Sequence, residues 1–124
     1  MSIDLLGVTG AAVQAALNAA SMRQIVGANN IANAGVAGYV PLRVSFEDAL
    51  RQALQEQSAG EHDVVMSQPE VFQDTAAALD GEPSVRLDEE SSKLVTNSIQ
   101  YQALLGGLRS EMDILETAAN DGKK

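Results

Sequence analysis

The chain has 124 residues, enough for one small domain with a modest core. It contains no cysteine, no tryptophan, two Phe and two Tyr, which excludes disulfides and leaves Ala, Leu, Val, Ile and Met to build the core. The formal net charge of −9 argues against nucleic acid as a partner, because neutralising phosphates requires a basic surface.

The excess negative charge is confined to the middle of the chain. Residues 44–90 carry twelve acidic side chains against two arginines, whereas residues 1–43 and 91–124 are close to neutral. Neutral, apolar ends can pack against many copies of themselves without accumulating repulsion. A solvated acidic loop is the simpler interpretation of the same pattern, and the charge distribution leaves both open.

A long helix is predicted over residues 3–32, within an N-terminal segment spanning residues 1–34. Small and apolar residues recur there at alternating spacings of four and three, as in a coiled-coil seam. The seam consists of Leu6, Gly10, Val13, Leu17, Ala20, Gln24, Gly27 and Ile31. The segment lacks a basic n-region and an uninterrupted apolar run of about 18 residues, so we expect neither a Sec signal peptide nor a membrane span.

The middle region, residues 35–87, is expected to combine a turn, a short helix and a flexible acidic loop. Gly38 permits positive φ and Pro41 forces the residue before it into an extended conformation, which predicts a turn followed by a short extended run. Ser45 is the candidate N-cap of a helix over residues 45–57. Residues 58–86 are polar, and we expect either a mobile linker or a loop that orders on assembly, in which residues 69–79 could form two helical turns.

The C-terminal segment, residues 88–124, carries the clearest periodicity in the chain. Its seam consists of Leu94, Ser98, Tyr101, Leu105, Leu108, Met112, Leu115 and Ala119. Asp88 is the expected N-cap and Gly122 the expected C-cap of this helix. Two seams of period 3.5 predict an all-α fold, in which the terminal helices pair as an antiparallel coiled-coil hairpin.

No catalytic or metal-binding pattern is recognisable. His62 is the only histidine and there is no cysteine, so no metal-ligand spacing is present. Glu89 and Glu90 are adjacent and point to different sides of a helix, which prevents them from acting as a paired acid and base. We therefore expect no enzyme, no metal site and no cofactor.

The stretch ANNIANAGVAGY, residues 28–39, closes the first helix with an unusual density of asparagine. It resembles the signature of the bacterial flagellar axial proteins of the rod and hook, in which an Asn-Asn-Ile-Ala-Asn-Ala core precedes Gly-Tyr or Gly-Phe. The matching residues are Asn29, Asn30, Ile31, Ala32, Asn33, Ala34, Gly38 and Tyr39. The chain departs from the family in lacking Thr-Pro before Gly38 and a basic residue after Tyr39, and Pro41 and Arg43 are candidates to replace them.

A second stretch, residues 79–108, resembles the proximal rod subunits of that family. These proteins have Asp-Gly, a short spacer, an acidic helix start and an Asn-Ser-apolar-x-Tyr-Gln element. The matching residues are Asp80, Gly81, Asp88, Glu90, Asn97, Ser98, Ile99, Tyr101 and Gln102.

The resemblance implies a structural subunit without catalytic activity in the periplasmic rod of the flagellar basal body. It implies export by the flagellar type III apparatus without a cleaved signal peptide, followed by helical assembly that transmits torque. The implied partners are other copies of the chain, other rod subunits, the adapter protein FliE, and the MS ring and export gate. The expected assembly interface comprises Asn29, Asn30, Ile31, Asn33, Gly38, Tyr39, Leu94, Asn97, Tyr101, Gln102, Leu105, Leu108 and Met112.

Two alternatives stay open. Amides buried at Asn29, Asn30 and Asn33 would fix the register between neighbouring subunits, because an unpaired buried amide costs about 1–3 kcal/mol. The same residues could instead form a helix C-cap and turn without any partner. At the level of function, the alternative is a soluble helical-hairpin adapter or export chaperone, which would be a stable dimer that does not polymerise.

Overall fold

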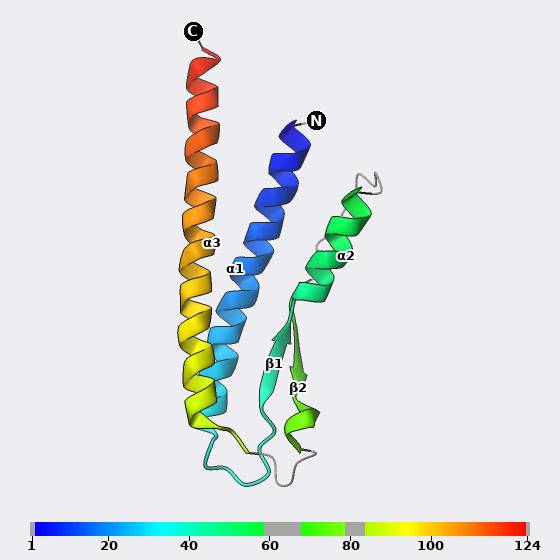
Figure 1. Cartoon of the computed structure of the whole chain (residues 1–124), viewed down its shortest axis with the longest axis vertical. Coiled ribbons are helices and arrows are strands. Elements are labelled where there is room, and N and C mark those ends of the chain that lie inside the picture. Colours follow the sequence, from blue (N-terminus) through cyan, green and yellow to red (C-terminus); the bar gives the residue numbers. More distant parts are fainter. Residues whose placement is uncertain (1, 59–67, 79–83, 124) are drawn as a thin grey trace.

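The structure, a computed structural model, describes residues 2–58, 68–78 and 84–123. In chain order its elements are α1 (Ser2–Ala32), β1 (Leu42–Ser45), α2 (Glu47–Ser58), β2 (Glu70–Gln73), the 3-10 turn η1 (Thr75–Ala78) and α3 (Leu87–Asp121). The long helices α1 and α3 run side by side in opposite directions, and β1 and α2 lie on the other side of α1 (Figure 1). His62, Asp80 and Gly81 lie outside the described residues.

The pairing of the two long helices confirms the predicted mostly helical fold. Asn97 of α3 donates a hydrogen bond to the Ala20 carbonyl of α1. Leu94, one turn before Asn97 in α3, packs against Gly27, which lies seven residues after Ala20 in α1. Moving toward the N-terminus of α3 thus means moving toward the C-terminus of α1, so the helices are antiparallel. The approach at Gly27 is so close that a Cβ atom there would lie 2.5 Å from Leu94 Cδ2.

A second buried face makes α1 the central element, which the seam alone did not predict. Arg23 and Asn30, both outside the seam, hydrogen-bond to backbone carbonyls of β1. Ala19 and Val26 lie on the same helical face and are buried. α1 therefore packs against α3 with one face and against β1 with another.

The strand pair corrects the expectation for the polar linker. β1 is the extended run predicted after Pro41, but residues 70–73 form a strand rather than helical turns. The two strands are antiparallel, with Leu42 opposite Gln73 and Val44 opposite Val71. All residues of β2 are exposed. The strand therefore depends on its pairing with β1 and not on burial of its own side chains, and the local sequence gives little sign of it.

Both predicted N-caps are wrong. Ser45 is the last residue of β1, and α2 begins at Glu47, whose carboxylate accepts the Phe46 N–H at 3.3 Å. The N-cap position of α3 is Arg86, which makes no side-chain capping hydrogen bond, and Asp88 lies in the first turn. An acidic side chain is favourable throughout the first turn, so composition alone locates a helix start only to within a residue or two.

Two glycines that the sequence singles out, Gly122 for a helix C-cap and Gly38 for a turn, both take these places. Gly122 is the C-cap of α3, as predicted, and its N–H donates to the Ala118 carbonyl at 3.1 Å. Gly38 has a φ of 77° and is the only glycine with positive φ in the described part of the chain. A side chain at Gly38 would therefore strain the turn between α1 and β1.

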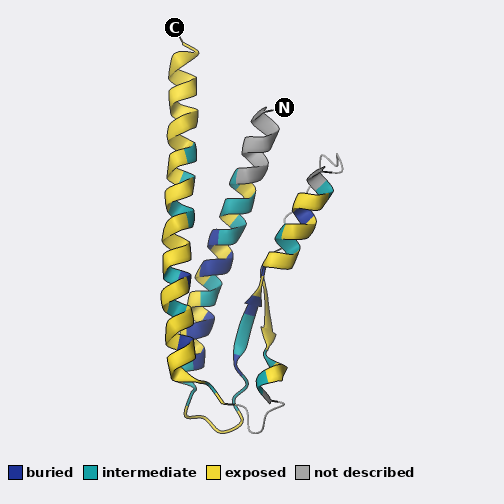
Figure 2. Ribbon diagram, viewed as in Figure 1, coloured by how far each residue is buried: buried dark blue, intermediate teal, exposed yellow. Residues whose placement is uncertain are grey.

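The core is small and lies in the half of the molecule near the turn. Its buried apolar residues are Leu17, Ala19, Ala20, Val26, Val44, Phe46 and Ala53. Figure 2 shows that α3 becomes almost entirely exposed toward its C-terminal end. Within the described ranges, the helices are not apolar over a length that would cross a membrane.

Candidate assembly site

Asn30, near the end of α1, is completely buried and makes four hydrogen bonds. Its Nδ2 donates to the Leu42 carbonyl at 3.0 Å and to Glu90 Oε2 at 3.2 Å. Its Oδ1 accepts the Leu42 N–H at 2.9 Å and the Tyr39 hydroxyl at 2.9 Å. These bonds use both donors and both lone pairs of the amide. One side chain thus joins the end of α1, the following turn, β1 and the start of α3.

Glu90, which is 2% exposed, brings a carboxylate into the same place. Arg43 Nη1 lies 2.6 Å from Glu90 Oε1, and Lys93 Nζ lies 3.9 Å from the same oxygen. Arg43 Nε is also 3.3 Å from Asp74 Oδ2, directly after β2. A buried carboxylate requires such partners, because an uncompensated charge is costly away from water. We call this cluster the polar junction, and its members are Asn30, Tyr39, Arg43, Asp74 and Glu90.

A groove of about 410 Å³ lies beside the polar junction, between α1, β1 and α3. Each charged side chain lining it has an ion-pair partner, including Arg23 with Glu47 at 2.6 Å and Lys93 with Glu89 at 2.9 Å. Partial burial raises the pKa of Glu47. The carboxylate accepts hydrogen bonds from Arg23 and from backbone N–H groups, and these bonds, together with the Arg23 charge, hold the pKa of Glu47 below its ordinary value. The hydrogen bond and charge of Lys93 lower the pKa of Glu89. The described residues of the groove therefore present no uncompensated charge to a ligand.

The other asparagines at the end of α1 are less buried. Asn33 Nδ2 donates to the Asn29 carbonyl at 2.8 Å, and that carbonyl also accepts the Asn33 N–H at 3.1 Å. The Asn29 side chain is exposed. Asn30 and Asn33 thus form hydrogen bonds within the chain, as in the cap-and-turn alternative, and contacts of these amides with neighbouring subunits remain a prediction. Nearby, Ile31 and Tyr39 are half-buried and Gly38 is exposed.

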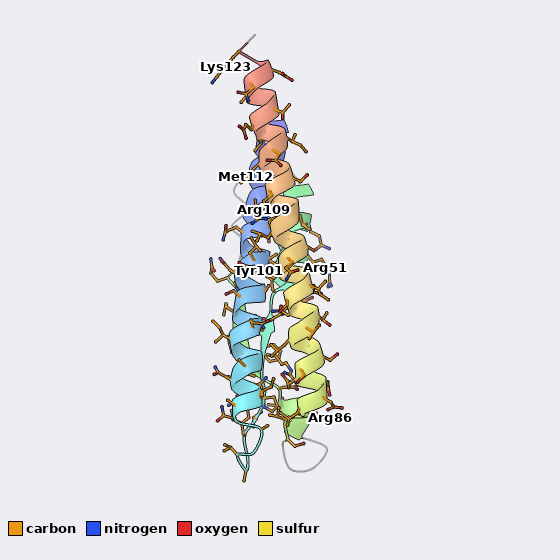
Figure 3. All side chains as sticks on the ribbon, turned by 90° about the vertical axis from the view of Figure 1, so that its left-hand side faces the viewer. Arg51, Arg86, Tyr101, Arg109, Met112 and Lys123 are labelled. Atoms are coloured by element: carbon orange, nitrogen blue, oxygen red, sulfur yellow. The ribbon has the colours of Figure 1, made fainter. Side chains whose placement is uncertain are left out.

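The predicted interface residues of α3 divide along the helix. Leu94 and Asn97 pack against α1, and Leu105 and Leu108 are half-buried. Tyr101 and Gln102 are exposed, Tyr101 by 38%. Beyond Leu108 the large apolar side chains are open to solvent: Met112 by 60%, Ile114 by 62% and Leu115 by 43%. Figure 3 looks onto α3 and shows Tyr101, Arg109 and Met112 following one another along it.

The Arg43–Glu90 pair is the main feature that sequence reasoning missed. The sequence indicates Arg43 only as a candidate replacement for the basic residue of the axial signature. It indicates Glu90 only as part of an acidic helix start. A usable signal existed, since Arg43 is the only charged residue between Arg23 and Glu47. A lone charge in an apolar stretch indicates an opposite charge brought from elsewhere in the chain.

Comparison with known proteins gives the family. No protein-family model matches the sequence. The chain is similar to the flagellar basal body rod protein FlgB of Bacillus subtilis (strain 168), with 32% identity over 117 residues. The match covers 87% of this chain and 90% of that protein. At this identity and coverage, the chain belongs to the FlgB family of flagellar basal body rod proteins.

Proposed function

We propose that the chain is a non-catalytic structural subunit of the proximal rod, which assembles in the periplasm with copies of itself and with other rod subunits. The relationship to the Bacillus subtilis rod protein is the observation that carries this proposal. The exposed C-terminal part of α3 supports it, because apolar residues such as Met112 and Leu115 stay uncovered in a single chain.

The subunit would link the MS ring and export gate to the distal rod, with the adapter protein FliE as a neighbour, and would reach this place through the flagellar type III apparatus. Support for these partners comes from the axial signatures at residues 28–39 and 79–108. Transmitting torque requires helices that do not slide past each other. Within the chain, Asn30 and the Arg43–Glu90 pair oppose such sliding, because displacing either would leave a buried polar group unpaired.

The predicted interface residues would then have two separate roles. Accessible side chains, such as Asn29, Gln102 and Met112, would contact neighbouring subunits. The buried side chain of Asn30 would act indirectly by holding the helices in the register that presents this surface.

Deletion of the gene in the bacterium that produces the chain tests this proposal. Electron cryotomography of the deletion strain should show MS rings without rods, and the wild-type gene supplied in trans should restore rods and motility. Normal rods in the deletion strain would contradict the proposal. Normal rods together with other rod subunits retained in the cytoplasm would instead favour an adapter or export chaperone.

A further inference from the structure

A hollow of about 280 Å³ lies between the two long helices, and its described lining residues all belong to α1 and α3. In the groove beside the polar junction, by contrast, residues of β1 and α2 also form part of the lining. We call it the α1–α3 crease. Its polar lining residues are Ser21, Gln24, Asn97, Ser98, Tyr101 and Gln102.

Asn97, in the crease, has an incomplete set of hydrogen bonds. Its Nδ2 donates to the Ala20 carbonyl at 2.7 Å and to Gln24 Oε1 at 2.9 Å. Asn97 is only 6% exposed, and its buried Oδ1 accepts no hydrogen bond from any described residue. Buried acceptors without a donor are uncommon, and leaving one unpaired is costly. The described part of the chain therefore supplies no donor to this acceptor in the crease.

The charge distribution indicates what can approach the crease. Residues 94–108 of α3 carry no charge, and the only charge between residues 5 and 42 is Arg23, which is paired with Glu47. A basic partner would be attracted instead to the acidic middle region. A second copy has the same net charge of −9, but the described residues of the crease present no negative charge that would repel it. The crease thus suits another copy of this chain.

The C-terminal end of α3 offers what the crease lacks. Arg109, Met112 and Leu115 lie on one side of the helix at spacings of three, and we call them the C-terminal ridge. Met112 is 60% exposed, and Arg109 is exposed without an ion pair to any described residue. A guanidinium group provides five N–H donors and no acceptor. The ridge therefore has free donors, whereas the crease has a free acceptor.

We propose that the α1–α3 crease of one copy receives the C-terminal ridge of the next, with Met112 filling the hollow and Arg109 donating to Asn97 Oδ1. The two surfaces are different parts of the same chain, so the contact is head-to-tail and each copy keeps one surface free. Such a contact extends into an open helical array, as a rod requires, when the rotation between successive copies does not close a ring. This inference rests on the proposed function, because it specifies how the self-assembly takes place.

Photocrosslinking within isolated basal bodies tests the proposal. A p-benzoylphenylalanine residue replaces the exposed Ser21 at the crease, and after irradiation the band at twice the chain mass is digested with trypsin. Cleavage after Arg109 and Lys123 releases the outer part of the ridge as a single peptide, residues 110–123. The adduct on Ser21 should carry this peptide. The same photoreactive residue at the exposed Gln52 of α2 should not.

A matched pair of variants on α3 tests the ridge itself. Met112→Glu should reduce the Ser21 adduct by about tenfold, which corresponds to a loss of ~1.4 kcal/mol in the contact. Val95→Glu introduces the same charge on the same helix at an equally exposed site, 62% against 60%, outside both surfaces. This control should leave the adduct yield unchanged. Equal losses in both variants would contradict the proposal.

The outcomes separate the inference from the proposed function. If the chain is present in basal bodies but the Ser21 adduct carries a different peptide, the crease-and-ridge contact is wrong and the rod assignment stands. If the chain is absent from basal bodies, the rod assignment fails and the inference fails with it.

Discussion

Arg43 of β1 and Glu90 of α3 form an ion pair with a separation of 2.6 Å between Nη1 and Oε1, at the point where the first helix, the strand pair and the last helix meet. Asn30 of α1 donates to the other oxygen of the same carboxylate. The beginning of α3 is therefore fixed to the end of α1 and to β1 by one buried carboxylate. This contact sets the register of the helix pair, from which the exposed part of α3 extends.

The two partners of this pair should not be equally sensitive to substitution. Arg43→Met leaves the Glu90 carboxylate buried without its nearest cation, and should lower the free energy of unfolding by about 3 kcal/mol. Glu90→Gln leaves Arg43 partly solvated and paired with Asp74, so the loss should be nearer ~1–2 kcal/mol. Urea unfolding followed by circular dichroism measures both. A larger loss for Glu90→Gln would contradict the burial argument.

Asn30 should contribute more to the fold than the neighbouring asparagine. Asn30→Ala removes four hydrogen bonds and leaves the Tyr39 and Leu42 groups without this partner, so we expect a loss of about 3 kcal/mol. Asn29→Ala, at an exposed side chain, should change stability by no more than about 0.5 kcal/mol. Equal effects of the two substitutions in urea unfolding would show that Asn30 is not the centre of the junction.

Alanine substitutions at two helical glycines should have opposite signs. Gly27→Ala places a Cβ 2.5 Å from Leu94 Cδ2, and the resulting overpacking should outweigh the gain in helix propensity and destabilise by about 1 kcal/mol. Gly106→Ala meets nothing within 4 Å and should stabilise by about 1 kcal/mol. Thermal unfolding compares the variants. Adding Leu94→Ala to Gly27→Ala should remove the clash, so strictly additive effects would argue against this close contact.

The Arg23–Glu47 pair should give a small pH dependence to stability. The folded pKa of Glu47 lies below its ordinary value of 4.5, so the unfolded chain binds more protons as the pH falls through this range. The stabilisation from the Arg23–Glu47 pair is therefore complete above about pH 4.5, and it is lost as the pH drops through the folded pKa of Glu47. Because the Glu47 side chain is 63% exposed, solvent screening keeps the contribution below about 1 kcal/mol.

Comparison with Glu47→Gln isolates this contribution from the other titrating groups. The stability difference between wild type and Glu47→Gln should shrink as the pH is lowered from about 6 to about 3. Arg23→Met should reduce the same pH-dependent difference, because it removes the cation and leaves only the backbone hydrogen bonds to lower the pKa of Glu47. A difference that grows toward acidic pH would contradict the assigned direction of the shift.

The sequence predicted the long helices and their antiparallel pairing because that pairing depends on residue spacing. Leu94 and Gly27 belong to the predicted seams and are in contact in the structure. β2 was missed because its pairing with β1 is a contact between distant residues, which local propensity does not encode. Glu90 lies in the first turn of α3 as predicted, but its ion pair with Arg43 was not predicted, for the same reason: the two residues belong to different elements.

The assembly surface was only partly predictable. The asparagine signature drew attention to Asn30, but its amide is fully used inside the chain. The predicted seam of α3 includes Met112, which is exposed in the single chain, because periodicity gives the side of a helix and not how far along it a partner helix covers that side. Such coverage depends on how the helices diverge, which follows from the packing of the whole chain.

Mass spectrometry of detergent-extracted basal bodies, before and after hook and filament are stripped, shows whether the chain is a rod subunit. The chain should remain with the stripped basal body in a constant ratio to the MS-ring protein. Recovery of the chain only from the cytoplasm would contradict the assignment and would favour a soluble adapter built on the same helical hairpin.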